Sequence, residues 1–352
     1  MSKVAVVLVN YHDYAKRFLA ECRQSLLAQN YDQKMINYYV VDNDSSEDSF
    51  DYLKKNFPEA KILRRNDGNY SAANNFGFNE AIKDNCQYLI TVNMDTVMDK
   101  NWLSELVKAI KTSPDIGIVQ SKILLYSSLK EKRNIINTLG NKLNYLGFGF
   151  TGSYGKEDRE DNEYRNIEGY ASGCSFITTA DIFKKIGAWN EEYYMYHDDV
   201  EFSLKIKLAG YRIILAPRSV VYHKYEFSRS IKMFYFMERN RYLTLFIFAD
   251  KKYLGLIFLP LFLIEIGMLV KSFFDKTFKQ RIKLYLYFLR PASWRNIREE
   301  RKKIRAIKNK SFSSLSKDFS SSIEFAEISS PLFKYFVNPF LRFFWFIIKP
   351  LV

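Results

Sequence analysis

Two positions far apart in the chain could together bind a metal ion. Asp95, in the segment Asn93-Met94-Asp95, follows an apolar run, and its carboxylate could bind a hard divalent cation such as Mg²⁺ or Mn²⁺, which in turn binds diphosphate oxygens. His223 ends another apolar run and is one of three histidines in the chain, so its imidazole could be a second Mn²⁺ ligand. The structural alternative for Asp95 is a turn or helix-capping acid.

The adjacent acids Asp198 and Asp199 begin a predicted helix that ends at Gly210. The helix dipole and the free N–H groups stabilise acids in a first turn, so capping alone explains the pair. The same field would keep a carboxylate ionised and able to accept a proton. Since successive helical residues face different ways, one acid could cap while the other faces a binding crevice. Trp189 and residues 193–196 precede the pair; their aromatic rings could stack on a sugar or pack in the core.

An alternation of strands and helices would position these side chains. Hydrophobic patterns predict strands at 4–10, 37–43, 60–66 and 87–95, with helices over 14–29, 45–57 and 71–83 between them. Further on, they predict strands at 170–179, 211–216 and 219–222, helices at 180–186 and 198–206, and loops or short hairpins over 130–164. This order predicts an α/β fold with a mostly parallel sheet and helices on both faces. Ligands bind at the carboxyl ends of such strands, where Asn10, Asp42 and Asn93 would share one crevice.

Composition and missing motifs exclude several classes of protein. With 47% hydrophobic and 26% charged residues, the chain is not disordered. No G-x-G-x-x-G follows the first strand and no G-x-x-x-x-G-K-[ST] occurs, which disfavours dinucleotide-binding dehydrogenases and P-loop ATPases. The three cysteines lack the spacing of a disulfide framework or a zinc site, and the first residues do not form an export signal. A cytoplasmic protein is expected.

The C-terminal third has a different character. Residues 254–270 are nearly all apolar, but the run is short for a membrane span and contains Pro260 and Glu265. Residues 279–310 hold twelve basic residues against two acidic ones, and an aromatic tail with interspersed Lys and Arg closes the chain. These features predict peripheral association with the anionic inner face of the cell membrane, with insertion or packing of 254–270 left open. Nucleic-acid binding is the alternative for the basic segment.

The ordered segments VAVVLVNYH, VVDNDSSED, RNDGNYSAANNFGF, YLITVNMDT, GYASGCSFITTADIFKKIGAWNEEYYMYHDDVEFSLKIKLAGYRI and VVYH resemble the inverting family 2 glycosyltransferases. The resemblance covers roughly residues 3–245 and is greatest to the bacterial rhamnosyltransferase-like branch. It implies a GT-A type nucleotide-diphospho-sugar transferase fold, a nucleotide-diphosphate sugar donor, and Mn²⁺ or Mg²⁺ as cofactor.

The resemblance also implies roles for individual residues. Asp42 corresponds to the acid that contacts the donor base or ribose. Asp95 corresponds to the last acid of the D-x-D metal motif, whose first acid is here Asn93, so coordination would rest on Asp95, His223 and the diphosphate. Asp199 corresponds to the general base, with Asp198 beside it.

The remaining predicted donor-binding residues are Asn10, Asn66, Gly68, Asn74, Arg239 and Arg241. Asn66, Gly68 and Asn74 fall in the segment that lines the nucleotide pocket, although one extra residue after Gly68 departs from the family pattern. Arg239 and Arg241 match a basic segment that could approach the diphosphate; solvated helix charges are the alternative.

The resemblance implies an inverting glycosyltransferase that transfers rhamnose from dTDP-rhamnose, and the basic and aromatic C-terminal third favours a lipid-linked or cell-surface polysaccharide as acceptor. A sugar nucleotidyltransferase would share the acids in the crevice and release pyrophosphate instead. The expected organisation is a catalytic domain at 1–225, a helical apolar and basic region at 226–310, and a Ser-rich linker with an aromatic amphipathic tail at 311–352.

Overall fold

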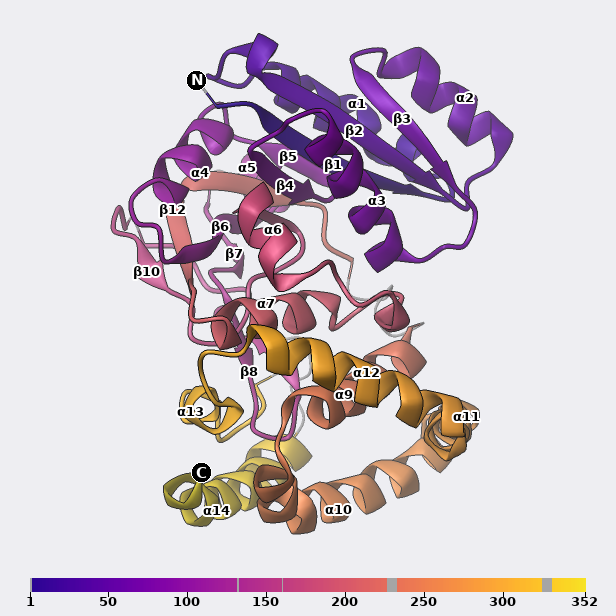
Figure 1. Cartoon of the computed structure of the whole chain (residues 1–352), viewed down its shortest axis with the longest axis vertical. Helices are drawn as coiled ribbons and strands as arrows, with labels where there is room; N and C mark the ends of the chain where they lie inside the picture. The colour runs from indigo at the N-terminus through magenta and orange to yellow at the C-terminus, as the bar shows by residue number, and fades with distance from the viewer. Residues whose placement is uncertain (1, 132, 160, 227–232, 325–330) are drawn as a thin grey trace.

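The computed structural model describes residues 2–131, 133–159, 161–226, 233–324 and 331–352. A large sheet with its covering helices forms one end of the molecule, and the C-terminal helices form the other end (Figure 1). The predicted α/β fold with a helical C-terminal region is therefore confirmed.

The sheet is mixed, in the strand order β10-β12-β6-β11-β4-β1-β2-β3. Its strands are β1 (Val4–Tyr11), β2 (Ile36–Asn43), β3 (Ala60–Arg65), β4 (Tyr88–Val92), β6 (Ile116–Leu125), β10 (Arg165–Asn166), β11 (Ser175–Thr179) and β12 (Arg212–His223). Strands β1 to β4 are parallel, as predicted. Strand β11 instead lies antiparallel between β4 and β6, with Ser175 opposite Val92, so it begins at the carboxyl end of β4.

Helices cover both faces of the sheet because its central strands are apolar on both sides. On one face, Val4, Val6 and Leu8 pack with α1 (Tyr14–Leu27), α2 (Glu47–Asn56) and α4 (Trp102–Ile110). On the other face, Ala5 and Val7 pack with α3 (Tyr70–Lys83), α6 (Ala180–Ile186) and α7 (Asp198–Leu208). A Cβ at Gly77 would lie 2.4 Å from Val7 Cγ1, so α3 can approach β1 this closely only with glycine there.

Strand β12 is one continuous strand, although the sequence predicts a break at Pro217. The register with β6 shifts between Ala216 and Val220, which accommodates a residue that has no backbone N–H to donate. Beyond the shift, β12 pairs with the short strand β5 (Thr96–Met98), and His223 lies opposite Thr96. This pairing brings the end of β12 beside the turn that follows β4.

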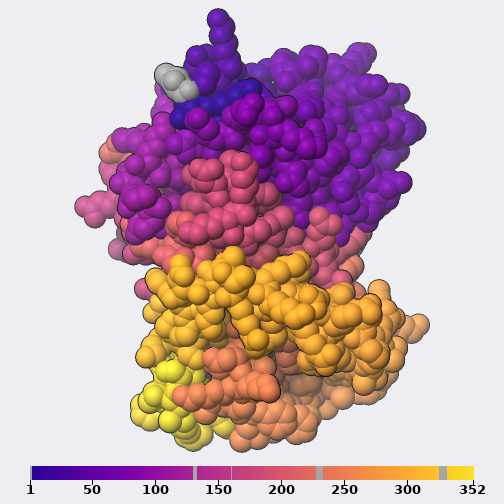
Figure 2. Space-filling model, in the orientation of Figure 1, coloured from indigo at the N-terminus to yellow at the C-terminus, as the bar shows by residue number. Residues whose placement is uncertain are grey.

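The C-terminal helices share a hydrophobic core with the sheet domain. They are α9 (Phe234–Phe248), α10 (Lys251–Phe274), α11 (Phe278–Leu289), α12 (Pro291–Ile307), α13 (Phe312–Ser316) and α14 (Asn338–Ile348). Their core joins Leu243, Ile297 and Trp345 to Leu204 of α7 and to the hairpin β8 (Asn141–Leu143) and β9 (Gly149–Thr151). Figure 2 shows the C-terminal helices directly against the sheet domain. The predicted Ser-rich linker packs against this body, with Phe312 buried; the domain boundaries at 225 and 310 stay predictions.

Candidate active site

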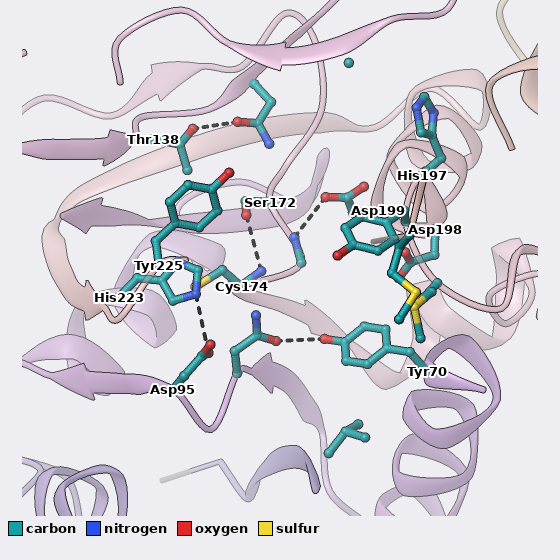
Figure 3. Close-up of a pocket in the computed structure, with 18 of the residues that line it drawn as sticks. Tyr70, Asp95, Thr138, Ser172, Cys174, His197, Asp198, Asp199, His223 and Tyr225 are labelled. Atoms are coloured by element: carbon teal, nitrogen blue, oxygen red, sulfur yellow. Dashed lines mark hydrogen bonds and ion pairs between the residues drawn. The ribbon is translucent and has the colours of Figure 1, made fainter. Parts of the chain in front are cut away.

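A cavity of about 470 Å³ lies at the carboxyl ends of β1, β2 and β4, where the sequence predicted the crevice. The hairpin β8–β9 and the first turn of α7 also contribute to its walls. Of the predicted site residues, it is lined by Gly68, Asn93, Asp95, Asp198, Asp199 and His223. Figure 3 shows Asp95 and His223 on one side of the cavity, and Asp198 and Asp199 across from them.

Asp95 and His223 form a close pair. Asp95 lies in the turn between β4 and β5, and the pairing of β5 with β12 brings His223 Nε2 to 3.4 Å from Asp95 Oδ1. The other ring nitrogen of His223, Nδ1, is 3.0 Å from Asn137 Oδ1. Burial opposes protonation of His223, but the neighbouring Cys174 and Asp95 raise its pKa well above the ordinary value, so without a cation Nε2 carries a proton directed toward Asp95. A cation bound to this pair would replace that proton, with the N–H at Nδ1 donating to Asn137.

This donor set fits a divalent cation that is also bound by its substrate. A carboxylate oxygen and an imidazole nitrogen suit Mn²⁺, and the hydrogen bond to Asn137 orients the imidazole as the second sphere of a metal site does. Among the described residues, no group of three His, Cys, Asp or Glu side chains could hold a metal ion. Coordination would therefore be completed by water and diphosphate oxygens, as is usual for Mg²⁺ and Mn²⁺ sites that bind substrate phosphates.

Asn93, a predicted donor-binding residue, is held by a neighbouring tyrosine. Its Oδ1 accepts a hydrogen bond of 2.9 Å from the Tyr70 hydroxyl, at the start of α3. Burial and the nearby Asp198 raise the pKa of Tyr70, so its hydroxyl stays a donor. The amide is thereby fixed at the cavity wall without the charge of a second carboxylate.

Asp198 and Asp199 occupy the first turn of α7, but neither is its N-cap residue. The N-cap is His197, in a left-handed conformation with φ of 58° and without a side-chain capping bond, so neither acid occupies the position that the capping alternative required. Asp199 Oδ2 accepts a hydrogen bond from the Gly173 N–H (3.3 Å), and Oδ1 accepts one from the Val200 N–H (2.9 Å). These two bonds orient the Asp199 carboxylate within the cavity.

Burial changes the protonation of the acidic pair. It raises the pKa of Asp199 to about 6. Burial, together with the charge of Asp199, raises the pKa of Asp198 well above its ordinary value. Near neutral pH, Asp199 is therefore an ionised carboxylate that accepts protons more readily than an exposed aspartate, and Asp198 favours its neutral form.

The segment before these acids is strained and is held by α9. Tyr194, Tyr196 and His197 all have positive φ values, which are costly for residues other than glycine. The buried Asn240 Nδ2 lies 2.8 Å, 2.9 Å and 2.7 Å from the carbonyl oxygens of Tyr193, Met195 and Tyr196. The interaction explains how an unfavourable backbone conformation persists next to the acids.

Arg239 and Arg241, on the same helix, lie outside the cavity and are buried. They therefore fit neither a contact with the diphosphate nor solvated charges on a helix. Arg239 Nη2 donates to the carbonyl oxygens of Glu192 (2.5 Å) and Tyr193 (3.0 Å). Arg241, only 1% exposed, pairs with Glu238 at 3.0 Å and donates to Leu146 O. Carbonyl and carboxylate oxygens of the protein thus bind both guanidinium groups, which leaves neither group facing the cavity or the solvent.

Asn10 and Asp42 are register partners on β1 and β2 and lie behind the cavity wall. Asn10 Nδ2 donates to Asp42 Oδ1 (2.6 Å), and the Ser45 hydroxyl donates to both Asp42 oxygens (2.7 and 2.8 Å). The next residue, Asn43, does line the cavity, and its Oδ1 accepts the Gly68 N–H (3.0 Å). The predicted contact of Asp42 with the donor base stays a prediction.

The segment from Asn66 to Asn74 contributes mainly Gly68 and Tyr70. Gly68 has φ of 67°, and a Cβ there would lie 2.3 Å from the Tyr194 hydroxyl oxygen, so only glycine fits without a shift. Asn66 is exposed and Asn74 is buried below the wall, where its Oδ1 accepts the Thr91 hydroxyl (2.9 Å). Neither side chain lines the cavity.

The aromatic residues before α7 divide between core and cavity. Trp189 is buried and stacks on Phe202 with centroids 4.5 Å apart, and Tyr193 is buried with its hydroxyl 3.0 Å from Thr244 Oγ1. Core packing therefore explains these two, whereas Tyr196 lines the cavity.

Several lining residues were not predicted from the sequence. They are chiefly backbone donors and neutral polar groups: Tyr70, Asn137, Gly173 and His197. His197 is neutral near pH 7, because burial and the charge of Arg241 lower its pKa to about 3, and in the described residues its Nδ1 has no hydrogen-bond partner. Of these, only His197 carries a signal in the sequence, since it directly precedes the two acids and the chain has few histidines.

The mixed sheet, its covering helices and the position of the cavity define a GT-A type fold. The fold is similar to the solved structure of GalNAc-T7 with UDP, GalNAc and Mn²⁺. The superposition covers 72% of this chain and 49% of that chain, with a TM-score of 0.56 and 17% sequence identity. The chain belongs to glycosyl transferase family 2, whose sequence profile matches residues 5–187. The family-level resemblance is thus confirmed.

Two sequence relatives match about half of this chain. An uncharacterised protein of Sinorhizobium fredii, y4gI, is 26% identical over 197 residues, which are 54% of this chain and 21% of that protein. The O-antigen biosynthesis protein RfbC of Myxococcus xanthus is 25% identical over 166 residues, 46% of this chain and 12% of that protein. The match therefore spans about a fifth or less of either relative.

Proposed function

We propose that this glycosyltransferase acts with inversion, and that Asp199 is its general base. One observation carries the proposal: in a single cavity, Asp199 faces the pair Asp95 and His223 from the opposite side. In an inverting displacement, the acceptor oxygen attacks the anomeric carbon opposite the leaving nucleoside diphosphate. A base and a leaving-group site must then lie on opposite sides of the sugar. Asp199 and the pair Asp95 and His223 lie on opposite sides of the cavity, which supports these two roles.

In this mechanism Asp199 accepts the proton of the acceptor hydroxyl as that oxygen attacks. The N–H groups of Gly173 and Val200 hold its carboxylate in place, and neutral Asp198 adds no competing charge. Asp95 and His223 would hold the divalent cation, Mn²⁺ or Mg²⁺, which when bound would neutralise charge on the diphosphate. The Tyr70–Asn93 pair holds the cavity wall beside them.

The donor is proposed to be dTDP-rhamnose. Its support is the sequence resemblance to the rhamnosyltransferase-like branch, and the match to an O-antigen biosynthesis protein is consistent with it. A UDP-sugar is the competing donor, since the similar structure of GalNAc-T7 contains UDP and GalNAc. A screen of dTDP-rhamnose, UDP-hexoses, UDP-N-acetylhexosamines and GDP-sugars tests this, with nucleoside diphosphate release as readout. Turnover of a UDP-sugar alone would refute rhamnose, and pyrophosphate release would indicate a nucleotidyltransferase.

The acceptor is proposed to be a lipid-linked or growing cell-surface polysaccharide, met at the inner face of the cell membrane. The basic composition of residues 279–310 and the aromatic tail support a cytoplasmic enzyme that binds this surface peripherally. The catalytic domain is proposed to end near residue 225, and the C-terminal helices to provide membrane association. Transfer to lipid-linked acceptor in vesicles, compared with a soluble acceptor analogue, tests this proposal.

A further inference from the structure

Helix α10 lies at the end of the molecule opposite the sheet (Figure 1). It exposes a row of large apolar side chains. Phe258, Phe262, Ile266, Val270 and Phe273 recur every three or four residues, so they share one side of the helix. Phe258 is 64% exposed and Phe273 61% exposed. Large exposed apolar patches are rare on soluble monomers and mark interaction surfaces.

The same surface includes the last helix of the chain. Helix α14 packs against α10 and exposes Phe343, Phe346 (80% exposed) and Ile347. On its other side, α14 packs into the protein through Trp345, which stacks on Tyr145 with ring centroids 4.7 Å apart. The outward side chains of α10 and α14 together are called the apolar end face below.

Other side chains of α10 bind the helix to the protein at two places. Near its start, the Tyr253 hydroxyl donates to Tyr145 O (2.8 Å). Near its middle, Glu265 accepts hydrogen bonds of 2.9 and 3.1 Å from Arg281 of α11, and the hydroxyls of Tyr242 and Tyr285 donate to it as well. Arg281 is 1% exposed and also pairs with Glu238 of α9 at 3.2 Å.

These contacts decide between crossing a membrane and lying on it. Among the described helices, only α10 is long and apolar enough to cross a bilayer, and since only 17% of its most apolar window is buried, it is not a core helix. If it crossed, Glu265 would reach the hydrocarbon interior together with Arg281, Glu238 and the helices that carry them. Charged groups at that depth are costly, and α11 and α12 are rich in exposed Lys and Arg. A helix lying in the membrane plane keeps this ion-pair cluster on the protein side.

Charge favours lipid as the partner of this surface. Exposed basic residues stand at both ends of α10, namely Lys251, Lys252 and Lys271. The segment 331–352 carries Lys334, Arg342 and Lys349 and contains no acidic residue. Aromatic and aliphatic side chains flanked by Lys and Arg are typical of helices that lie in the interface of an anionic bilayer.

We propose that the apolar end face is a monotopic docking surface for an anionic lipid bilayer, with α10 and α14 in the membrane plane and Glu265 fastening α10 to the protein. The inference deepens the proposed membrane association by naming the surface and its orientation. It needs no donor or acceptor to be tested.

Co-flotation of the purified full chain with vesicles tests the surface. The chain should bind phosphatidylcholine vesicles that contain phosphatidylglycerol, and bind pure phosphatidylcholine more weakly. Phe262→Glu and Phe346→Glu should each lower the partition coefficient by about tenfold or more, because each removes a large apolar side chain from lipid. The matched control is Leu129→Glu, which changes a 44% exposed leucine of α5 (Ser127–Glu131), outside the apolar end face. Equal binding of all four chains would overturn the proposal.

Depth measurements decide the orientation. The three native cysteines are buried, so single nitroxide labels at Phe258→Cys, Phe262→Cys, Ile266→Cys and Val270→Cys report on α10. An in-plane helix places all four labels at one shallow depth, whereas a crossing helix separates the first and last by about 18 Å along the membrane normal. The second pattern would overturn the proposal.

A second copy of the chain is the competing occupant of this surface. Sedimentation without lipid would then show a dimer that Phe262→Glu dissociates, and vesicle binding would be absent. Transfer to a soluble acceptor, measured on the same variants, separates this proposal from the proposed function. A variant that loses vesicle binding but keeps transfer to the soluble acceptor would support the docking surface without bearing on the proposed activity. A parent chain that binds vesicles but transfers no sugar would refute the proposed activity and leave the docking surface standing.

Discussion

His223 Nε2 lies 3.4 Å from Asp95 Oδ1. Asp95 lies in the turn before β5 and His223 ends β12, and the pairing of these two strands brings them together. If this pair holds the cation, Asp95→Ala should weaken Mn²⁺ and nucleotide binding together by at least about tenfold, because the diphosphate shares the ion. His223→Ala should act in the same direction but less strongly, since imidazole carries no negative charge. Calorimetric titration of nucleoside diphosphate with and without Mn²⁺ measures both effects. Unchanged Mn²⁺-dependent affinity in Asp95→Ala would remove this residue from the site.

The pH dependence of turnover should follow the ionisation of Asp199. Burial raises its pKa to about 6, and only the ionised form accepts a proton. Turnover should therefore rise with pH, level off above about 6, and fall about tenfold per unit well below that value. A pH profile of kcat at saturating donor and metal measures this limb. A flat profile between pH 5 and 8 would contradict the assigned base.

The buried acids should cost stability at neutral pH. The folded-state pKa of Asp199 is raised, so folding favours the protonated carboxyl group. As the pH rises from near 4 to about 6, this group ionises in the unfolded chain first, and the free energy of unfolding falls. Asp199→Asn removes that loss and should raise the free energy of unfolding by about 1–3 kcal/mol at pH 8, with a much smaller gain at pH 4.5. Asp198→Asn should act in the same direction. Denaturant unfolding at both pH values measures the difference, and equal gains would contradict it.

The sheet and the position of the cavity were predictable because their signals are local. Strands β1 to β4 are short apolar runs between helical patterns, and the polar residues at their ends follow directly in the sequence. The antiparallel entry of β11 was not predictable, because strand direction depends on how residues 130–174 cross the sheet. The continuity of β12 through Pro217 likewise depends on a register shift against β6, which a proline in isolation does not indicate.

The acids of the site were predictable and their supporting groups were not. Asp95, Asp199 and His223 stand out by residue type and by their place next to predicted elements. Gly173 acts through a backbone N–H from a loop, and Asn137 acts through a neutral amide from the short strand β7 (Ile136–Thr138), so neither composition nor spacing reveals them. Arg239 and Arg241 illustrate the opposite error: their charge indicated an anionic ligand, but buried carbonyl and carboxylate oxygens of the protein bind them.

Asn240 should be a positioning residue for the base. Its amide binds three carbonyl oxygens of the strained segment before Asp198, so Asn240→Ala leaves those groups without their donor. The variant should lower kcat by about tenfold or more while the KM for donor changes little, because Asp199 and not the donor site is displaced. Asn240→Asp, which removes the donor and keeps the size, should not rescue kcat, whereas Asn240→Gln should restore part of it. If all three variants lose only thermal stability, with kcat unchanged in the folded enzyme, the residue is merely structural.

The most direct measurement is the turnover of Asp199→Asn, together with its donor affinity and melting temperature. Asn keeps the size of the side chain and can still accept the Gly173 N–H, but it cannot take the acceptor's proton. Turnover should fall by about 10²–10⁴-fold with donor affinity nearly unchanged and folding intact, and Asp198→Asn should lose less. A folded Asp199→Asn enzyme with near-normal turnover would contradict the assignment of Asp199 as general base, and with it the proposed inverting mechanism.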